Sequence, residues 1–150
     1  MQPVTVKLLR VASRGAPLPP PQYQTPGAAG ADLQADLDQP LTLRPGQRVL
    51  VPTGFAIELP QGYEAQIRPR SGLAVRSGVG IPNAPGTIDA DYRGEIQVAL
   101  INWGQEPVTL QRGDRIAQLV VAPVARAAFD LVEALAHSER GSGGFGSTGK

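Results

Sequence analysis

The sequence predicts an all-β protein with the architecture of a compact sandwich or jelly roll. Two observations carry this prediction: apolar residues alternate with polar ones over short runs, and Gly or Pro turn signals separate the runs at hairpin spacing. The 18 glycines and 15 prolines among 150 residues supply many turns without reaching low complexity. The length fits a single domain with a real core, whose strand edges must be covered.

The expected strands of the N-terminal half show a period of two, and turn signals such as Pro45-Gly46 precede several of them. The alternating residues are Val4, Val6 and Leu8, then Val49 and Val51, then Phe55, Ile57 and Leu59, and finally Tyr63, Ala65 and Ile67. Residues 17–26 are rich in proline and are expected to form a loop.

Two later runs, 96–102 and 115–121, are apolar at nearly every position, as strands buried on both faces would be. Only residues 71–77 and 129–136 have patterns compatible with a short helix. We therefore expect one β domain over residues 1–136, followed by a Gly-rich segment over residues 137–150.

Charge and composition exclude several classes of function. The formal net charge is +1 and no long run of Lys or Arg is present, so neither nucleic acid nor an acidic membrane is expected as a partner. The absence of cysteine excludes disulfides, thiolate metal sites and cysteine catalysis. Residues 1–15 lack the apolar core of a signal peptide, and no stretch approaches a membrane span. We expect a cytoplasmic protein, and any phosphate partner is small.

The C-terminal residues contain two phosphate-binding patterns. Gly141, Gly143 and Gly146 fit G-x-G-x-x-G, and residues 144–150 fit G-x-x-x-x-G-K. Both motifs act at the N-terminus of a helix that follows a strand, and neither element is expected here. The charge of Arg140, two hydroxyl groups and one aromatic ring are nevertheless the parts of a nucleotide lid. The plain alternative is a disordered Gly-rich terminus.

Polar residues also gather at turns. Arg70 and Ser71 follow a predicted strand in an arrangement that suits an anion, although a surface turn with a capping serine explains the same residues. Residues 83–94 outline a tight hairpin whose mouth would expose backbone groups to a flat base edge. Within it, Asp89 or Asp91 is either a turn cap or a general base for water.

Three further polar residues stand out. Asp32 is a candidate carboxylate beside a metal ion, and Gln118 is a polar residue inside a strand that ought to be core. His137 lies in a charged connector, where we expect it to be solvated.

Five segments taken together closely resemble the five ordered motifs of the trimeric dUTPases, the dUTP pyrophosphatases. The segments are AGADL (29–33), PRSGLA (69–74), NAPGTIDADYRGE (83–95), GDRIAQL (113–119) and RGSGGFGSTG (140–149). Each motif alone is modest, but five in the same order and spacing are highly specific.

The resemblance implies a dUTPase-like β-clip, a jelly roll that assembles as a homotrimer with active sites shared between subunits. It implies hydrolysis of dUTP to dUMP and pyrophosphate with Mg²⁺ as cofactor. That reaction removes dUTP from the nucleotide pool and supplies dUMP for thymidylate synthesis. Residues 137–150 would then be a flexible lid over the active site.

The resemblance also implies roles in catalysis and phosphate binding. By motif position, Asp89 deprotonates the water that attacks the α-phosphorus, and Asp32 approaches Mg²⁺ through water. The residues implied to contact phosphate are Arg70, Ser71, Gly72 and Gln118, with Arg140 on the γ-phosphate.

Base and sugar recognition are implied at the third and fifth motifs. The residues that match the uracil-binding positions are Asn83, Gly86, Thr87 and Ile88. Tyr92 matches the ring that packs beneath deoxyribose, where a ribose 2′-hydroxyl would not fit. Phe145 matches the ring that stacks on the base, and Gly146, Ser147 and Thr148 match the closing cradle.

Two alternative functions stay open from the sequence. The dCTP deaminases share this fold, but their catalytic Glu aligns with Ala99, and no nearby His or Glu is expected to replace it. A non-catalytic dUTP-sensing module would have no reason to keep Asp89, Tyr92 and the Gly-rich segment together. Arg76-Ser77 and Pro82 depart from the usual family residues and leave fine base selectivity open.

Overall fold

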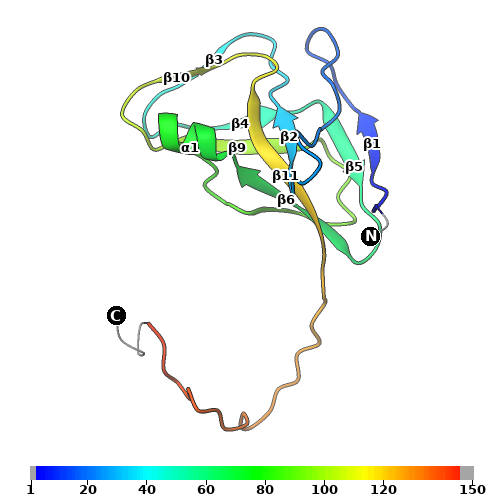
Figure 1. The fold of residues 1–150 in the computed structure, drawn as a ribbon, viewed down its shortest axis with the longest axis vertical. Helices are drawn as coiled ribbons and strands as arrows, with labels where there is room; N and C mark the ends of the chain where they lie inside the picture. The colour runs from blue at the N-terminus through cyan, green and yellow to red at the C-terminus, as the bar shows by residue number, and fades with distance from the viewer. Residues whose placement is uncertain (1–2, 146–150) are drawn as a thin grey trace.

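The computed structural model describes residues 3–145, which form a β-rich body and an extended C-terminal segment (Figure 1). The all-β prediction is confirmed, because eleven strands and one short helix make up the regular structure of this range. In chain order the elements are β1 (Lys7–Arg10), β2 (Ala31–Gln34), β3 (Leu41–Leu43), β4 (Arg48–Pro52), β5 (Phe55–Glu58), β6 (Tyr63–Pro69), α1 (Ser71–Ser77), β7 (Val79–Gly80), β8 (Gly86–Ile88), β9 (Gln97–Asn102), β10 (Val108–Leu110) and β11 (Arg115–Pro123).

The strands form four antiparallel sheets. The largest has the strand order β2-β11-β6-β8, and the second has the order β4-β9-β7. Two further pairs, β1-β5 and β10-β3, complete the body. In this arrangement β8 lies at an edge of the largest sheet and pairs only with β6, which leaves its outward backbone groups free of ladder bonds.

The core lies between the sheets and is built from the alternating residues. Val51, Ile57, Ala65 and Ile67 are all buried, as the period of two predicts. Burial of one such Val or Ile side chain stabilises the fold by about 1.5–3 kcal/mol. The first predicted strand is only partly right: β1 begins at Lys7, and every residue of the strand is exposed.

Strand β9 corrects one expectation. Residues 96–102 were expected to be buried on both faces, but Gln97 is exposed and Ala99 and Ile101 are half-buried, while Val98 and Leu100 are fully buried. One face of β9 packs into the core, and no part of residues 3–145 covers its other face completely. Strand β11 behaves similarly, with a half-buried Gln118 between the buried residues Ala117 and Leu119.

Helix α1 confirms the prediction for residues 71–77. It ends at Gly78, whose φ of 69° lies in the left-handed region and whose N–H donates to the carbonyl groups of Ala74 and Leu73. A Cβ at Gly78 would lie 2.5 Å from the backbone nitrogen of Gly104, so glycine is required for packing as well as for conformation.

The helix expected at residues 129–136 is not formed. The segment is extended, and Phe129 and Leu131 are 98% and 101% exposed. A short helix is marginal in water without a surface to pack on, and the segment packs on no other part of the described chain. The last backbone hydrogen bond to the body runs from the Val124 N–H to the carbonyl of Gly62. Within residues 3–145, no helix is long and apolar enough to cross a membrane.

The proline-rich loop at residues 17–26 is confirmed, apart from one isolated bridge between Gln22 and Asp32. Asp32 is the second residue of β2, so this bridge brings the loop against a strand of the largest sheet.

Asn102, at the end of β9, is a fully buried polar residue whose side chain joins three backbone segments. Its Nδ2 donates to the carbonyl groups of Leu43 and Glu106 at 2.9 and 2.8 Å, and its Oδ1 accepts from the Gly104 N–H at 2.8 Å. Every polar atom of the amide group therefore has a partner.

We expect Asn102→Leu to lower the free energy of unfolding by about 3 kcal/mol, because three backbone groups lose their partner at nearly constant side-chain volume. Denaturant unfolding at fixed protein concentration measures this loss. Thr109→Val, which removes only an exposed hydroxyl pair with Thr42, is the control and should change stability by less than about 0.5 kcal/mol. Equal losses in the two variants would contradict the prediction.

Candidate active site

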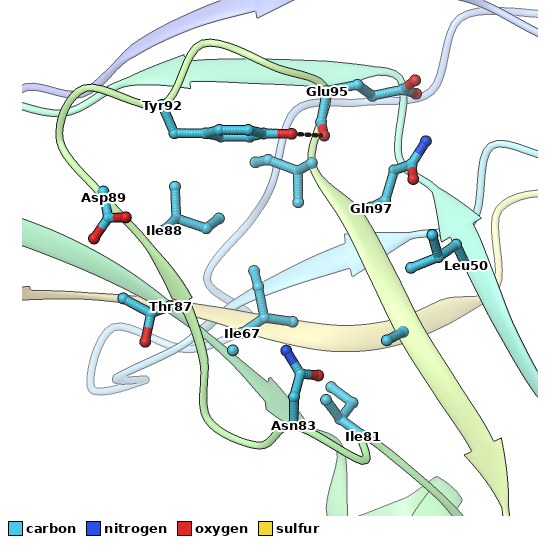
Figure 2. A pocket seen from close by; sticks show the side chains of 13 residues that line it. Leu50, Ile67, Ile81, Asn83, Thr87, Ile88, Asp89, Tyr92, Glu95 and Gln97 are labelled. Atoms are coloured by element: carbon cyan, nitrogen blue, oxygen red, sulfur yellow. Dashed lines mark hydrogen bonds between the residues drawn. The ribbon is translucent and has the colours of Figure 1, made fainter.

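A cavity of about 230 Å³ opens between β8, β9 and the turn that joins them (Figure 2). Its apolar walls come from isoleucines of β6, β8 and neighbouring segments, and its polar side chains come from the turn, from β8 and β9 and from the residues before β8. Its lining includes Ile67, Asn83, Gly86, Thr87, Ile88, Asp89, Tyr92 and Glu95. A mostly apolar cavity with a few convergent polar groups is the usual form of a ligand site.

Strand β8 forms the wall that a flat ligand would face. Gly86 lies opposite Ile67 of β6, and a Cβ at Gly86 would come within 3.3 Å of the Asn83 Nδ2 and 3.4 Å of the Ile67 Cβ. Glycine therefore lets the Asn83 amide and the β8 backbone lie close together. The Asn83 amide points into the cavity beside Ile67 and Ile81 (Figure 2).

The turn after β8 holds Asp89 and Tyr92 at the rim of the cavity. The Tyr92 N–H donates to the Asp89 carbonyl at 3.1 Å, and the Tyr92 hydroxyl donates to the Glu95 carbonyl at 3.1 Å. A Cβ at Gly94 would lie 2.3 Å from the Tyr92 hydroxyl oxygen, so the ring needs glycine there. Figure 2 shows the Tyr92 ring lying across one side of the cavity, with the exposed Asp89 carboxylate at another.

Residues 83–94 do not form the two-stranded hairpin that the sequence suggested. Strand β8 pairs with β6 in the largest sheet, whereas β9, which follows the turn, pairs with β4 and β7. The turn therefore crosses from one sheet to the other, and the cavity lies in the space between them.

A second polar cluster surrounds Asp32, which is 5% exposed. Arg70 Nε lies 3.1 Å from Asp32 Oδ1, and Arg115 Nη1 donates to Oδ2 at 3.2 Å. Gln118 of β11 is directly opposite Asp32 in the antiparallel register. Two guanidinium groups and an amide at one point of the sheet provide donors of the kind that bind phosphate oxygens.

Ser71 and Gly72 begin helix α1, beside this cluster in the sequence. The N-cap of α1 is Arg70, and no side chain accepts a capping hydrogen bond there. The alternative that Ser71 is a capping serine is therefore wrong.

The C-terminal segment lies away from the cavity and from the Asp32 cluster. In Figure 1 it leaves the body after β11, and Arg140 Nε donates only within the segment, to the Gly143 carbonyl at 2.7 Å. Phe145 is fully exposed with a φ of 50°. Gly146, Ser147 and Thr148 lie outside the described residues.

No group of three or more His, Cys, Asp or Glu side chains within residues 3–145 is arranged to hold a metal ion. A single carboxylate oxygen is nevertheless of interest for a metal ion. Asp32 Oδ1 is buried and makes no hydrogen bond, although Arg70 lies in contact with it. A metal ion that brings its own waters and phosphate ligands would need only such a single carboxylate.

A profile of the dUTPase family matches residues 16–149. The chain belongs to the dUTPase family. A curated member, the deoxyuridine 5′-triphosphate nucleotidohydrolase of Anaeromyxobacter sp. (strain Fw109-5), is 68% identical over 148 residues and covers 99% of both chains.

Solved dUTPase structures share the fold. The dUTPase of Staphylococcus bacteriophage 80alpha with bound dUpNHpp is 25% identical, with a TM-score of 0.84 over 97% of this chain and 99% of that one. A mutant dUTPase from phage phi11 of S. aureus, described with a structural Mg(II) ion, is 20% identical, with a TM-score of 0.77 over 87% and 97% of the two chains.

Within one dUTPase chain the predicted site residues fall into three groups. Asn83, Gly86, Thr87, Ile88, Asp89 and Tyr92 all line the cavity. Asp32, Arg70 and Gln118 form the second cluster and do not line it, and Arg140 and Phe145 belong to the C-terminal segment.

Sequence reasoning missed two residues. Glu95 lines the cavity together with Ala99, but its carboxylate points away from the cavity in Figure 2 and is bound by Arg14, so it does not take the place of the deaminase glutamate. The second residue is Arg115, which forms an ion pair with Asp32, as Arg70 does. Both lie inside the quoted family motifs, but no local spacing indicates their partners.

Proposed function

We propose that this chain hydrolyses dUTP to dUMP and pyrophosphate in the cytoplasm, which lowers the dUTP pool and supplies dUMP for thymidylate synthesis. The observation that supports this most is the gathering of Asn83, Tyr92 and Asp89 around one cavity, beside the edge strand β8. Together these groups can recognise a nucleobase, pack against a sugar and accept a proton from water at a single place. The cysteine-free composition suits a reducing compartment.

Uracil recognition follows from the edge position of β8. Its outward backbone N–H and C=O groups, with the Asn83 amide, can pair with the polar edge of uracil in the manner of adenine. Cytosine would place an amino group against a donor, and the 5-methyl group of thymine would meet the cavity wall. The Tyr92 ring lies where deoxyribose would pack, so a 2′-hydroxyl would clash with it.

Hydrolysis begins when Asp89 accepts a proton from a water molecule as the water oxygen attacks the α-phosphorus. The bond from that phosphorus to the oxygen bridging to the β-phosphorus breaks, and pyrophosphate leaves with the electron pair. Arg70, Gln118 and the backbone at Ser71 and Gly72 stabilise the charge that develops on the phosphate oxygens.

Asp32 is the residue that would hold a Mg²⁺ ion, through one of the ion's waters. Its buried Oδ1 has the Arg70 guanidinium at 3.1 Å but no hydrogen bond, so it can still accept one from such a water. The ion would neutralise part of the triphosphate charge. Arg70 and Arg115 balance the Asp32 carboxylate in the chain as described.

A complete site needs all three groups of residues, and one chain does not bring them together. We propose a homotrimer in which the cavity of one subunit meets the Asp32 cluster of a second and the C-terminal segment of a third. The exposed apolar side chains of Phe129, Leu131 and Leu135 support an assembly, since a monomer would leave them in water.

Two inactive variants should therefore complement each other. When Asp89→Asn chains and chains truncated before Gly141 are denatured, mixed equally and refolded, random trimers should regain about one quarter of wild-type activity, because each site draws its Asp89 and its tail from different subunits. Each variant refolded alone is the control and should stay near zero. If trimers are confirmed by light scattering and no activity returns, the site lies within one chain.

The proposed activity is tested by incubating each deoxynucleoside triphosphate, and UTP, with the protein and Mg²⁺ while monophosphate, pyrophosphate and ammonia are quantified. We expect dUMP and pyrophosphate from dUTP in equal amounts. Ammonia released from dCTP would support the deaminase alternative, and dUTP binding without turnover would support the sensing module. EDTA should abolish turnover if the reaction depends on the metal.

A further inference from the structure

Four charged residues from distant parts of the sequence form one ion cluster beside the cavity. Arg14 Nη1 lies 3.0 Å from Asp36 Oδ2 and 2.9 Å from Glu95 Oε1, and Arg14 Nη2 donates to Glu95 Oε2 at 3.3 Å. On the other side, Arg112 Nη1 donates to Asp36 Oδ1. The cluster therefore alternates in charge in the order Arg112, Asp36, Arg14 and Glu95.

The cluster is mostly withdrawn from solvent. The Asp36 side chain is 2% exposed and that of Glu95 is 17% exposed. The fold also closes around it: a Cβ at Gly54 would lie 2.8 Å from Asp36 Oδ2, and a Cβ at Gly15 would lie 3.0 Å from Arg112 Nε. The hydrogen bond to Glu95 and then that to Asp36 raise the pKa of Arg14 above its ordinary value, against an opposing effect of burial.

Glu95 connects this cluster to the cavity. Its carboxylate is held by Arg14 and by the Gly54 N–H, which donates to Oε1 at 2.8 Å. Its carbonyl oxygen accepts the hydrogen bond of the Tyr92 hydroxyl (Figure 2). The next residue, Ile96, is fixed through its N–H to the Phe55 carbonyl at 2.7 Å. The peptide unit that accepts the Tyr92 hydroxyl bond is therefore held by the Phe55 carbonyl on one side and by the Glu95 side chain on the other.

We propose that Arg14 and Asp36 are positioning residues for sugar selection, which hold Glu95 so that its carbonyl fixes the Tyr92 ring against the deoxyribose. The inference rests on the proposed function, through the role of Tyr92. Arg14 and Asp36 touch no substrate in this scheme and act only through Glu95. Arg112 in turn orients Asp36, with further bonds to the carbonyls of Ala16 and Leu37.

The first test measures kcat and KM for dUTP and UTP. We expect Arg14→Met to lower the ratio of kcat/KM for dUTP to kcat/KM for UTP by about tenfold, because a displaced Tyr92 ring admits the 2′-hydroxyl of UTP. Arg14→Lys, which keeps the charge but not the two-pronged contact, should recover part of the ratio. Adding Arg14→Met to Glu95→Gln should change this ratio little further, because both substitutions break the same ion pair between Arg14 and Glu95.

Two controls separate positioning from general stability. Lys7→Met removes the exposed ion pair with Glu58 and should leave the ratio unchanged. Leu110→Val weakens the core in β10, outside the cavity lining, and should lower Tm without changing the ratio. An unaltered ratio in Arg14→Met would overturn the proposal, whether or not Tm falls as it does in Leu110→Val. If Arg14→Met fails to fold, Glu95→Gln is measured instead, because it retains an acceptor for the Gly54 N–H. An unaltered dUTP/UTP ratio in Glu95→Gln would likewise overturn the proposal.

A second readout does not depend on activity. The chain has three tyrosines, so fluorotyrosine labelling gives three ¹⁹F resonances, and Tyr92→Phe identifies that of Tyr92. Arg14→Met should shift the Tyr92 resonance and leave those of Tyr23 and Tyr63 in place, whereas an unshifted Tyr92 resonance would overturn the proposal. A wild-type chain that does not hydrolyse dUTP would refute the proposed function, and a Tyr92 shift in that case would still establish the connection from Arg14.

Discussion

Replacing Asp89 by Asn should lower kcat for dUTP by about a hundredfold or more while Mg·dUTP binding persists. The change keeps the size of the side chain and its capacity for turn hydrogen bonds, and removes only the ability to accept a proton from water. Asp89 is exposed at the rim of the cavity, so the substitution should not affect folding. Steady-state kinetics and calorimetric titration with a non-hydrolysable dUTP analogue measure the two effects separately.

Asp91→Asn is the matched control for this variant. Asp91 lies in the same turn, is also exposed and does not line the cavity, so its loss should change turnover by less than about threefold. A result in which Asp91→Asn is inactive and Asp89→Asn is active would reverse the assignment of the base between the two residues.

Truncation before Gly141 should lower turnover by roughly a hundredfold without lowering Tm. Between Val124 and Phe145 the segment has no backbone hydrogen bond to the body, so truncation there leaves the core intact. Its proposed contribution is made only with substrate bound, when the aromatic ring covers the base and the segment excludes water. Thermal unfolding and dUTP turnover of the shortened chain test both expectations.

Single substitutions refine this test. Phe145→Ala should reproduce much of the loss, whereas Ser142→Ala, in the same segment, should be near wild type. Full activity after truncation would return the segment to the plain interpretation of a Gly-rich terminus.

Much of the fold could be predicted because its signals are local. The period of two at Ala65 and Ile67 of β6 reports which side chains point inward, and Gly78 marks the end of α1. Residues 129–136 show the limit of this reasoning, because their helix-compatible pattern depends on a packing surface that the described chain does not provide.

The site could be predicted only in part, because some of its contacts join residues that are far apart in the sequence. Asn83, Asp89 and Tyr92 line one cavity, as expected for residues of one continuous segment, and their roles there stay predictions. The partnership of Arg14 with Glu95 joins residues 81 positions apart, and neither residue type is unusual for a surface. Such long-range ion pairs follow from how the sheets stack and not from any local spacing.

The anchoring of the chain at Val124 has a kinetic consequence. From there the segment continues for sixteen residues to Arg140, a contour length of roughly 50 Å when extended. A tether of this kind replaces free diffusion by an effective local concentration, in the millimolar range for short flexible linkers. Closure over the substrate is then a first-order event whose rate does not depend on protein concentration once subunits are assembled. The length of the tether sets which cavity is within reach, so shortening it should first favour closure and then abolish it when the span becomes too great.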